Sequence, residues 1–420
     1  MARVWTPNDA HNLLTLMCRE ITGQDATIQT VNTSNFTSIG ERLLTTGVEN
    51  VLNTLSTVIF RDLIAVRPFK AKFRTLRAES TGLFQQRIRK ISYFAKDPLP
   101  SGNFNTDLFT NAYPNFTAGE NPDANGVPQS TKSQWEQHPP VCEQYCFGGS
   151  SVFQDCITYY LDKLEVAFRD ETAFTNFVDG YVTEKFNDIE SQKEGFARVN
   201  LLNHIAGTID MTASMPGSVK DMTALFNAYM GGTTYTRDQI FNAHLREFTA
   251  FFIAEMKNDI LDMEQRSVKY HINPAKTIDG VTYNLLRHTP RDKQRLLMYA
   301  PFWNLVEATV YSAVFNDQWL KPENFEAIAY WQNENEGAKI DITPSVPDLV
   351  NGVQIQGSNV ACDYVLGTLH DVDALWIDYQ LENARTSTLE SRKGYYNTWL
   401  NYAFNACNDL TEKTIVYVMN

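Results

Sequence analysis

The sequence lacks the short motifs that identify many enzyme families. It contains no HExxH zinc motif, no GxxxxGK phosphate loop and no GxGxxG dinucleotide fingerprint, and residues 148–151 miss the GxSxG nucleophile elbow. Its seven histidines are scattered along the chain. We therefore expect no enzyme activity and no cofactor, and we assign no catalytic, cofactor-binding or metal-binding residues.

Cysteine is scarce as well. The six cysteines follow no disulfide or zinc-site spacing, which indicates reduced thiols in a cytoplasm. The only close pair, Cys142 and Cys146, is expected on one strand, where residues i and i+4 lie roughly 13 Å apart. That separation is too large for a disulfide, and we expect no metal site there.

Long apolar runs are also missing. No run of about 18 apolar residues is present, so no membrane span is expected, and the first ten residues lack the apolar core of a signal peptide. The 420 residues, 43% of them apolar, suffice for two or three domains or one elaborate domain. A net charge of −13 argues against general nucleic-acid binding by the whole surface.

One segment carries the opposite charge. Residues 61–96 hold ten lysines and arginines but only two carboxylates. The segment is either a solvated strand face or an electrostatic contact with an acidic partner, protein or DNA. A neighbouring copy of this acidic chain is one candidate. We predict intersubunit contacts at Arg74, Arg77, Arg87, Arg89 and Lys90.

Residues 172–206 are predicted to form one long helix, because apolar residues recur at intervals of three and four and no proline interrupts them. The helix would span roughly 50 Å, although Gly180 and Gly195 allow a bend. It is either a long core helix or a spine that joins separate lobes of an extended subunit. Its core-facing side chains are predicted to include Phe177, Tyr181, Phe186 and Val199.

A long hairpin is predicted before this helix. Residues 84–94 alternate as a strand does, and a return strand is expected within residues 140–160. The intervening loop is long and polar, which is uncommon unless a loop is functional or disordered. Because a lone ribbon is only marginally stable, the hairpin either lies on a neighbouring subunit or is a loose insertion on a monomer.

Further helices are predicted over residues 8–19, 41–60, 221–230, 304–315 and 321–331. Another begins at Thr236, where Gln239 completes a capping box, and runs to about residue 263. His244 lies on or beside its apolar face, and we interpret it as a core-edge histidine rather than a metal ligand.

Strands are predicted over residues 295–299 and 353–355, and their alternation with helices favours a compact α/β lobe. The remainder of the chain is rich in β-formers. Segments 374–382, 387–392, 395–407 and 414–419 are predicted to form a meander with turns at 393–394 and 408–409.

With these elements in order, the chain resembles the major capsid proteins of tailed bacteriophages with the HK97-type fold, and most closely those of φ29-like podoviruses. The most telling stretch is residues 373–419, DALWIDYQLENARTSTLESRKGYYNTWLNYAFNACNDLTEKTIVYVM. There an apolar, a charged, an aromatic and an apolar strand succeed one another, as at the end of that family's chains.

The resemblance implies an α+β fold with five parts along the chain. These are an N-terminal arm (1–75), an E-loop hairpin (76–160), a P domain with the spine helix (161–211), an A domain (212–369) and P-domain return strands (370–420). It also implies a major capsid protein that assembles into hexamers and pentamers of an icosahedral or prolate shell. The shell would enclose packaged double-stranded DNA in the virion, after assembly in the bacterial host cytoplasm.

Partners follow from the same resemblance. The main partner would be further copies of the chain, joined by a portal at one vertex and a candidate decoration protein. A separate scaffolding protein is expected because the sequence shows no coiled-coil leader, and the immunoglobulin-like domain of some φ29-like capsid proteins is missing. DNA would be contacted weakly and without sequence specificity, since an acidic shell lets the genome move in, and no membrane is expected.

Two other functions stay open at this point. The first is an encapsulin-type compartment shell on the same fold, which a cargo enzyme inside the particle would identify. The second is a cytoplasmic enzyme of unrecognised family, which a compact small oligomer stabilised by a ligand would identify.

Overall fold

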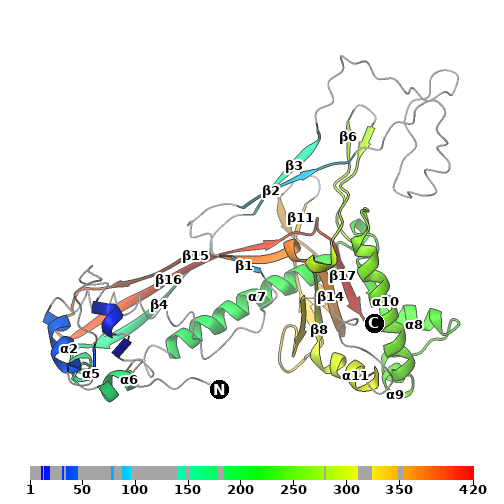
Figure 1. The fold of residues 1–420 in the computed structure, drawn as a ribbon. Helices are drawn as coiled ribbons and strands as arrows, with labels where there is room; N and C mark the ends of the chain where they lie inside the picture. The colour runs from blue at the N-terminus through cyan, green and yellow to red at the C-terminus, as the bar shows by residue number, and fades with distance from the viewer. Residues whose placement is uncertain are drawn as a thin grey trace, which may run out of the picture.

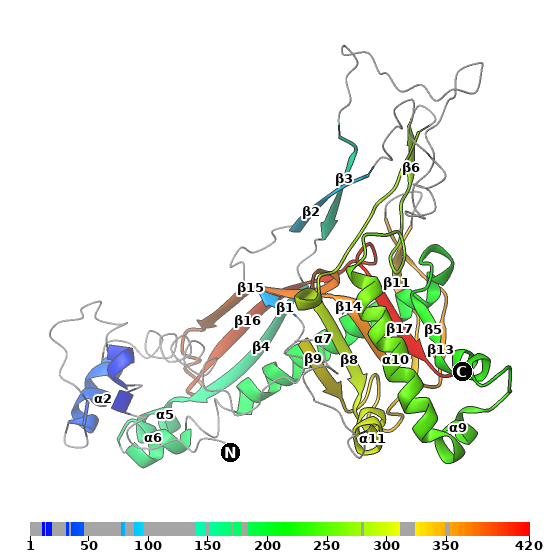
Figure 2. The ribbon, with the colours of Figure 1, turned by 45° about the vertical axis from the view of Figure 1, so that its right-hand side comes forward.

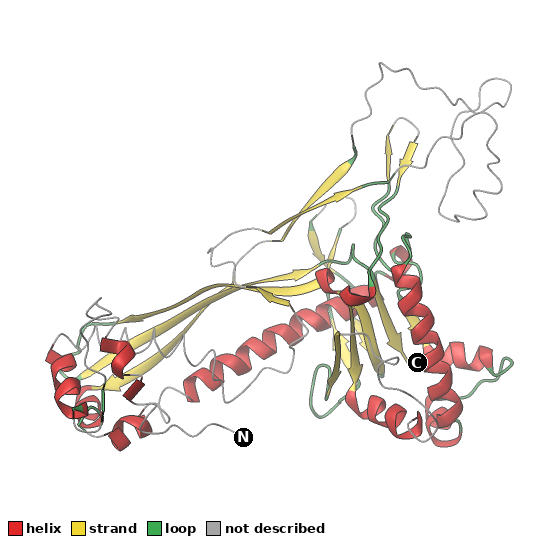
Figure 3. Ribbon diagram, in the orientation of Figure 1, coloured by secondary structure: helices red, strands yellow, loops and turns green. Residues whose placement is uncertain are grey.

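The computed structural model describes residues 11–12, 14–18, 31–32, 35–45, 77–79, 88–95, 140–147, 151–169, 171–177, 184–278, 281–310, 324–348 and 353–420. They form an extended subunit in which a long, narrow sheet reaches out from one side of a compact lobe (Figure 1). A two-stranded hairpin projects away from both parts (Figure 2). Helices flank the two main sheets (Figure 3), and the expected α+β class is confirmed.

The long sheet, here called the arm sheet, has the strand order β1-β15-β16-β4. Its side chains alternate between two faces: Tyr159 and Tyr402 are buried on one face, whereas Tyr160 and Trp399 are exposed on the other. The strand bounds are β1 Arg77–Glu79, β4 Ser151–Tyr160, β15 Leu375–Thr386 and β16 Tyr395–Asn408.

Three short helices and the N-terminal segment cover the far end of the arm sheet (Figure 1). The helices are α2 Phe36–Thr45, α5 Leu161–Ala167 and α6 Glu171–Phe177. They share a core in which Leu14, Phe36 and Phe174 are fully or almost fully buried. The N-terminal segment is also held by His11, whose Nε2 lies 2.8 Å from Oε1 of Glu171.

The lobe contains a five-stranded sheet, here called the lobe sheet, in the order β5-β17-β14-β8-β9. Its strands are β5 Val219–Asp221, β8 Gln294–Tyr299, β9 Asn324–Ile328, β14 Val365–Asp371 and β17 Thr414–Val418. Both faces are covered, so alternate residues of a strand enter different cores. In β17, Tyr417 packs with the lobe helices, whereas Val416 and Val418 pack on the opposite side.

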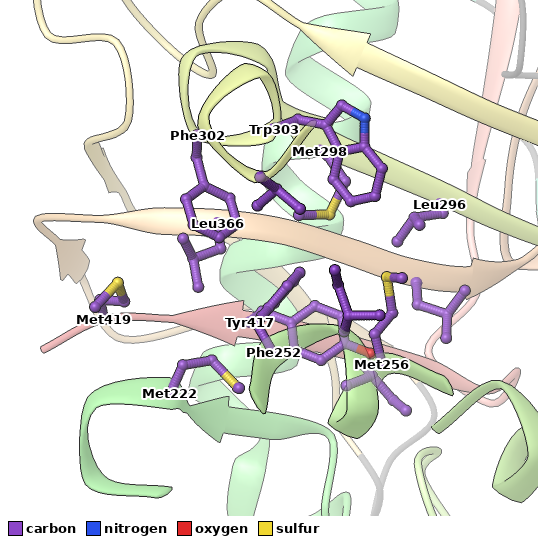
Figure 4. Packing of buried hydrophobic residues seen from close by; sticks show 14 of the residues in the cluster. Met222, Phe252, Met256, Leu296, Met298, Phe302, Trp303, Leu366, Tyr417 and Met419 are labelled. Atoms are coloured by element: carbon purple, nitrogen blue, oxygen red, sulfur yellow. The ribbon is translucent and has the colours of Figure 1, made fainter. Parts of the chain in front are cut away.

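Four helices cover one face of the lobe sheet: α8 Met222–Tyr229, α9 Arg237–Ala243, α10 Leu245–Glu264 and α11 Ala300–Val310. Large side chains fill the space between them and the sheet (Figure 4). Phe252, Met256 and Phe302 are fully buried there, and the Phe252 and Phe302 rings meet edge to face. The predicted capping box at Thr236 and Gln239 is present at the start of α9.

The remaining strands form small two-stranded sheets. They are β2 Ile88–Tyr93 with β3 Cys142–Phe147, β6 Lys276–Ile278 with β7 Val281–Tyr283, β10 Ile340–Ile342 with β13 Val360–Cys362, and β11 Ser345–Pro347 with β12 Gln354–Gln356. Short 3-10 turns occur at η2 Thr212–Ser214, η3 Arg291–Lys293 and η6 Val372–Ala374. None of the helices in the described ranges combines the length and the apolar character that crossing a bilayer requires.

The spine helix α7, Glu184–Asp210, runs beneath the arm sheet and into the lobe (Figure 1). Its 27 residues correspond to about 40 Å. Near its start Ile189 joins the core at the far end of the arm sheet. Further along, Leu201 and Ile205 enter a core that contains residues of both the arm sheet and the lobe sheet. The helix therefore links the two parts of the subunit.

The predicted helix over residues 172–206 corresponds to two helices, α6 and α7, with residues 178–183 outside the described part. Of its predicted core residues, Phe177 is buried but belongs to α6. Tyr181 and the side chain of Phe186 lie outside the described residues. Val199 is 60% exposed, so the prediction that it faces the core is wrong.

The error at Val199 has a helical explanation. Residues two positions apart differ by about 200° around a helix, and both Ala197 and Leu201 are buried. The buried stripe also includes the polar residues Asn200 and His204. Because polar residues occupy part of this stripe, the apolar pattern alone placed Val199 on the wrong side.

Other predicted elements also differ. Residues 321–331 are expected to be helical, but the structure has strand β9 there. The predicted helix from Thr236 divides into α9 and α10 at His244. The half-buried ring of His244 has its centre 4.4 Å from that of Tyr235. The expected meander is wrong at two points, since no strand is assigned over residues 387–392 and β17 joins the lobe sheet. Of the predicted helix 41–60, only residues 41–45 are described; they lie in the second half of α2, which begins at Phe36.

The packing of α7 makes a quantitative prediction. Ile205→Ala should lower the free energy of unfolding by about 2–5 kcal/mol, because this fully buried side chain would leave a cavity between the two sheets. Val199→Ala, on the exposed side of the same helix, should change it by less than about 0.5 kcal/mol. Denaturant titration of isolated subunits, followed by circular dichroism, measures both; equal losses would contradict the assigned packing.

Candidate assembly site at the base of the hairpin

The hairpin β2–β3 leaves the body next to the turn that connects β16 to β17. Its antiparallel register pairs Ile88 with Phe147 and Tyr93 with Cys142. The predicted strand and return strand are therefore present, and the second half of the predicted return segment is β4 of the arm sheet. Cys142 and Cys146 lie on β3 as expected, both exposed and neither in a disulfide.

The two sides of β2 differ in burial and in chemistry. Lys90, Ser92 and Phe94 face the body, and Ser92 and Phe94 are buried. Ile91 and Tyr93 alternate with them and are 55% and 62% exposed. The strand thus has an inward side docked on its own subunit and an outward side that leaves large apolar side chains in solvent.

The docked side centres on an ion cluster of Lys90, Arg287, Asp409 and Glu412, in which the two carboxylates are buried and the two cations partly buried. The Nζ of Lys90 lies 2.6 Å from Oδ2 of Asp409 and also contacts Oε1 of Glu412. Arg287 lies 3.3 Å from the same Glu412 oxygen and donates a 2.6 Å hydrogen bond to Oγ of Ser92. Two positive and two negative groups therefore balance one another.

Burial and ion pairing compete in setting the charges of this cluster. Burial opposes ionisation of Asp409, but the adjacent Lys90 and the hydrogen bonds from Thr411 outweigh it and lower the pKa of this carboxyl. Burial likewise opposes the charge on Lys90, but its two carboxylate partners raise its pKa. The pKa of Glu412 is raised, because its burial outweighs the attraction of Lys90 and Arg287.

A second attachment lies further along the hairpin. Ala95 exchanges backbone hydrogen bonds of 2.8 and 3.1 Å with Asn284, which follows β7. Lys276 of β6 lies 3.5 Å from Glu143 of β3, with its Nζ 5.2 Å from the centre of the Phe94 ring. The β6–β7 hairpin therefore braces the β2–β3 hairpin, and the two project together (Figures 1 and 2).

The structure places the five predicted contact residues unevenly. Arg74 and Arg87 lie outside the described residues, as do the side chains of Arg77 in β1 and Arg89 in β2. Lys90 is described, and its carboxylate partners belong to its own chain. Intersubunit contact by the four arginines stays a prediction.

Sequence reasoning missed the acidic half of the ion cluster. The segment 408–413, NDLTEK, lies between two predicted strands, and its sequence predicts only a turn at residues 408–409. The available signal was the placement of Asp409 and Glu412 between two strongly apolar strands, opposite in charge to residues 61–96. Their partner Lys90 is 319 positions from Asp409, a separation that no local pattern spans.

A second buried polar group joins the spine helix to both sheets. His204 of α7 is fully buried, with its Nδ1 2.6 Å from Oδ1 of Asn408 and its Nε2 2.8 Å from Oγ1 of Thr414. Because an amide oxygen only accepts, Nδ1 carries the proton and Nε2 accepts from the hydroxyl. The ring of His370 lies 5.8 Å away, and neither of its nitrogens has a hydrogen-bond partner among the described residues.

Burial lowers the pKa of His204 and lowers that of His370 much further. The described residues also contain no cluster of three or more histidine, cysteine or acidic side chains arranged to hold a metal ion. Because burial lowers both pKa values, the two rings are neutral groups within the protein interior.

These histidines predict how stability depends on pH. An unfolded imidazole takes up a proton below pH ~6.5 while the buried rings stay neutral, so the free energy of unfolding should fall as the pH drops from 7 to 5. His370→Leu should flatten this dependence by up to ~1.4 kcal/mol per pH unit. Thermal or denaturant unfolding across this pH range measures the slope.

The exposed His288 provides the matched control, because His288→Gln removes a histidine that is not buried. Carboxyl groups whose pKa is raised in the folded protein, such as Asp259, increase the free energy of unfolding as the pH falls further. They do so equally in the wild type, in His370→Leu and in His288→Gln. An unchanged slope in His370→Leu would contradict the assignment of a neutral buried ring.

Comparison with known proteins identifies the fold. No protein-family model matches the sequence, and no curated protein matches it. A chain in "Structure of head fiber and inner core protein gp22 of native bacteriophage P68" is 11% identical over 84% of this chain and 85% of that chain, with a TM-score of 0.51. A chain of the capsid structure of Staphylococcus phage Andhra is 12% identical over 84% and 85%, with a TM-score of 0.49. The first match has the same overall fold, and the expected HK97-type architecture is confirmed.

Proposed function

We propose that this chain is a major capsid protein, which assembles with copies of itself into the shell of a bacteriophage head. The observation that carries the proposal is the β2–β3 hairpin. It leaves the body as a two-stranded ribbon, and its outward side exposes Ile91 and Tyr93. A ribbon without a core of its own is marginally stable in water, and a neighbouring subunit would cover this side.

The arm sheet supports the same proposal. One face packs on α7 and the short helices, while the opposite face exposes Val152, Tyr160 and Trp399. Large apolar side chains gathered on one sheet face are typical of interaction surfaces. The extended shape, with projections in two directions, suits a subunit that contacts several neighbours (Figure 1).

The finer parts of the proposal follow from the resemblance and from charge. The subunits would form hexamers and pentamers of an icosahedral or prolate shell in the virion, with a separate scaffolding protein, a portal and a candidate decoration protein as partners. The role would be structural rather than enzymatic. With a net charge of −13, the shell would attract packaged double-stranded DNA only weakly and without sequence specificity.

The five-part division of the chain also remains a proposal. Residues 1–75, 76–160, 161–211, 212–369 and 370–420 would be the N-terminal arm, E-loop, P domain, A domain and return strands. One refinement is that β17, within the last part, pairs with β5 and β14 of the lobe.

The direct test is electron microscopy of the protein expressed together with its neighbouring genes. Closed shells without a cargo enzyme are expected. Shells filled with a cargo enzyme would instead favour a compartment protein. A small, compact oligomer whose melting temperature rises with a ligand would favour an enzyme and overturn the proposal.

Removing the hairpin tip should separate folding from assembly. Replacement of residues 97–132, which lie outside the described residues, by a short Gly-Ser turn should leave the body folded but unable to close a shell. Circular dichroism and microscopy measure the two properties. Hydrogen exchange over residues 83–158 should be slower in assembled wild-type shells than in free subunits; equal rates, or normal shells from the variant, would contradict an intersubunit arm.

The basic segment yields a separate prediction. The double change Arg87→Glu and Arg89→Glu should block shell formation, because the acidic surface of a neighbour would repel the two new carboxylates. The subunit itself should stay folded. The matched control, Arg291→Glu with Lys293→Glu, makes the same charge change at exposed positions of η3 and should assemble. Sedimentation and microscopy measure assembly. Shells from the first variant with unchanged salt sensitivity would make the segment a solvated face.

A further inference from the structure

We propose that Lys90 is a positioning residue, which sets the direction of the β2–β3 hairpin through its ion pairs with Asp409 and Glu412. The proposal changes the role of this residue from a contact with a neighbour to an anchor within its own subunit. Its effect on shell geometry rests on the proposed function, whereas its effect on the hairpin does not.

Both carboxylate partners of Lys90 are buried. Asp409 is 2% exposed and Glu412 is 6% exposed, so neither carboxylate is well solvated. A buried charge that loses its partner keeps the cost of leaving water without the gain of pairing. A rotation of the hairpin that moves Lys90 away from Asp409 and Glu412 would leave these two buried carboxylates with Arg287 as the remaining basic member of the cluster. The observed direction is therefore strongly preferred over others.

Consecutive inward residues along β2 and directly after it have separate partners. Lys90 meets the turn at residues 409–412, Ser92 accepts from Arg287, and Phe94 lies beside Lys276. The contacts with the turn, with the segment after β7 and with β6 lie in succession along β2. A single contact would leave the hairpin free to swing about it, but contacts in a line restrict both swing and twist.

Other titratable groups face the cluster. They are Tyr145 of β3, whose hydroxyl donates a hydrogen bond to Glu143, and Asp371 of β14. Because the pKa of Lys90 is raised, its ammonium group stays charged at least up to pH 10.5, the ordinary pKa of a lysine. Because the pKa of Asp409 is lowered, its carboxylate stays charged down to below pH 3.8, the ordinary pKa of an aspartate. These two partners therefore stay charged at neutral pH.

Salt distinguishes this anchor from contacts between subunits. Ion pairs between exposed charges weaken as ionic strength rises, whereas buried pairs are screened much less. Hairpin order in the free subunit should therefore resist salt, even where salt weakens assembly.

The test is hydrogen exchange on isolated full-length subunits, comparing wild type with Lys90→Met, which removes the charge but retains an unbranched apolar side chain. Protection of amides in residues 88–95 and 142–147 should fall on the order of 100-fold. Amides of β8 and β14 should keep their protection and serve as the internal reference. Raising the salt to 1 M should leave the wild-type protection of the hairpin within about threefold.

Two controls refine the comparison. Lys90→Arg retains the charge and should keep most of the protection. Ile91→Thr changes the exposed side of the same strand to another β-branched residue and should leave protection unchanged. Wild-type protection in Lys90→Met, or an equal loss in Ile91→Thr, would overturn the proposal.

A milder variant covers the case in which Lys90→Met unfolds the whole subunit. Glu412→Gln leaves the pair of Lys90 with Asp409 and should reduce hairpin protection on the order of tenfold, with β8 and β14 unaffected. Unchanged hairpin protection in Glu412→Gln would count against the anchor.

Shell geometry provides the last measurement. In Lys90→Met, shells of mixed curvature or open sheets are expected where the wild type forms uniform shells, because the hairpin no longer reaches a fixed place on its neighbour. If wild-type subunits form no shells, the proposed function fails while hydrogen exchange still decides the role of Lys90. If Lys90→Met loses hairpin protection yet forms uniform shells, the link between hairpin direction and shell geometry is wrong.

Discussion

Polar groups in and beside the β16–β17 turn constrain the whole subunit, because several of them pair with distant parts of the chain. Asn408 bonds His204 of the spine helix, and Asp409 pairs with Lys90 of the hairpin. Lys413 is fully buried, and its Nζ donates to backbone oxygens at the end of α10, including that of Gln265 at 2.5 Å. Since unpaired buried polar groups are costly, spine, hairpin and lobe are fixed relative to one another at this turn.

The spine helix shows how the same constraint selects a register. Asn200 donates a 3.2 Å hydrogen bond to the backbone oxygen of Cys407, one turn before His204 meets Asn408. Apolar contacts alone tolerate a helix that slides along a sheet, because the hydrophobic effect has no direction. Hydrogen bonds at successive turns do not tolerate it. The position of the lobe at the end of the arm sheet follows from this match.

Local features were predictable from the sequence, and long-range ones were not. The capping box at Thr236 and the strand over residues 295–299 depend on neighbouring residues, and both are present. The phase of α7 was not predictable, because its buried stripe includes Asn200 and His204. Pairing of β17 with the lobe sheet depends on distant strands, which propensity does not reveal.

The candidate site was only half predictable, for the same reason. The excess of lysine and arginine in residues 61–96 is visible in the sequence, and so is its contrast with the acidic remainder. Which member of the segment turns inward is decided by the alternation of β2 and by the place where Asp409 and Glu412 arrive in space. Charge composition identified the segment, but it did not separate the inward-facing Lys90 from the residues around it.

The place of β17 within the lobe sheet has a consequence for synthesis on the ribosome. β17 lies between β5 and β14, and the turn before it holds the carboxylates that anchor the hairpin. The lobe therefore lacks an interior strand, and the hairpin lacks its anchor, until residues 409–418 have been translated. Until then a nascent chain would carry an undirected hairpin, which delays competence for contact with other copies until the lobe can close.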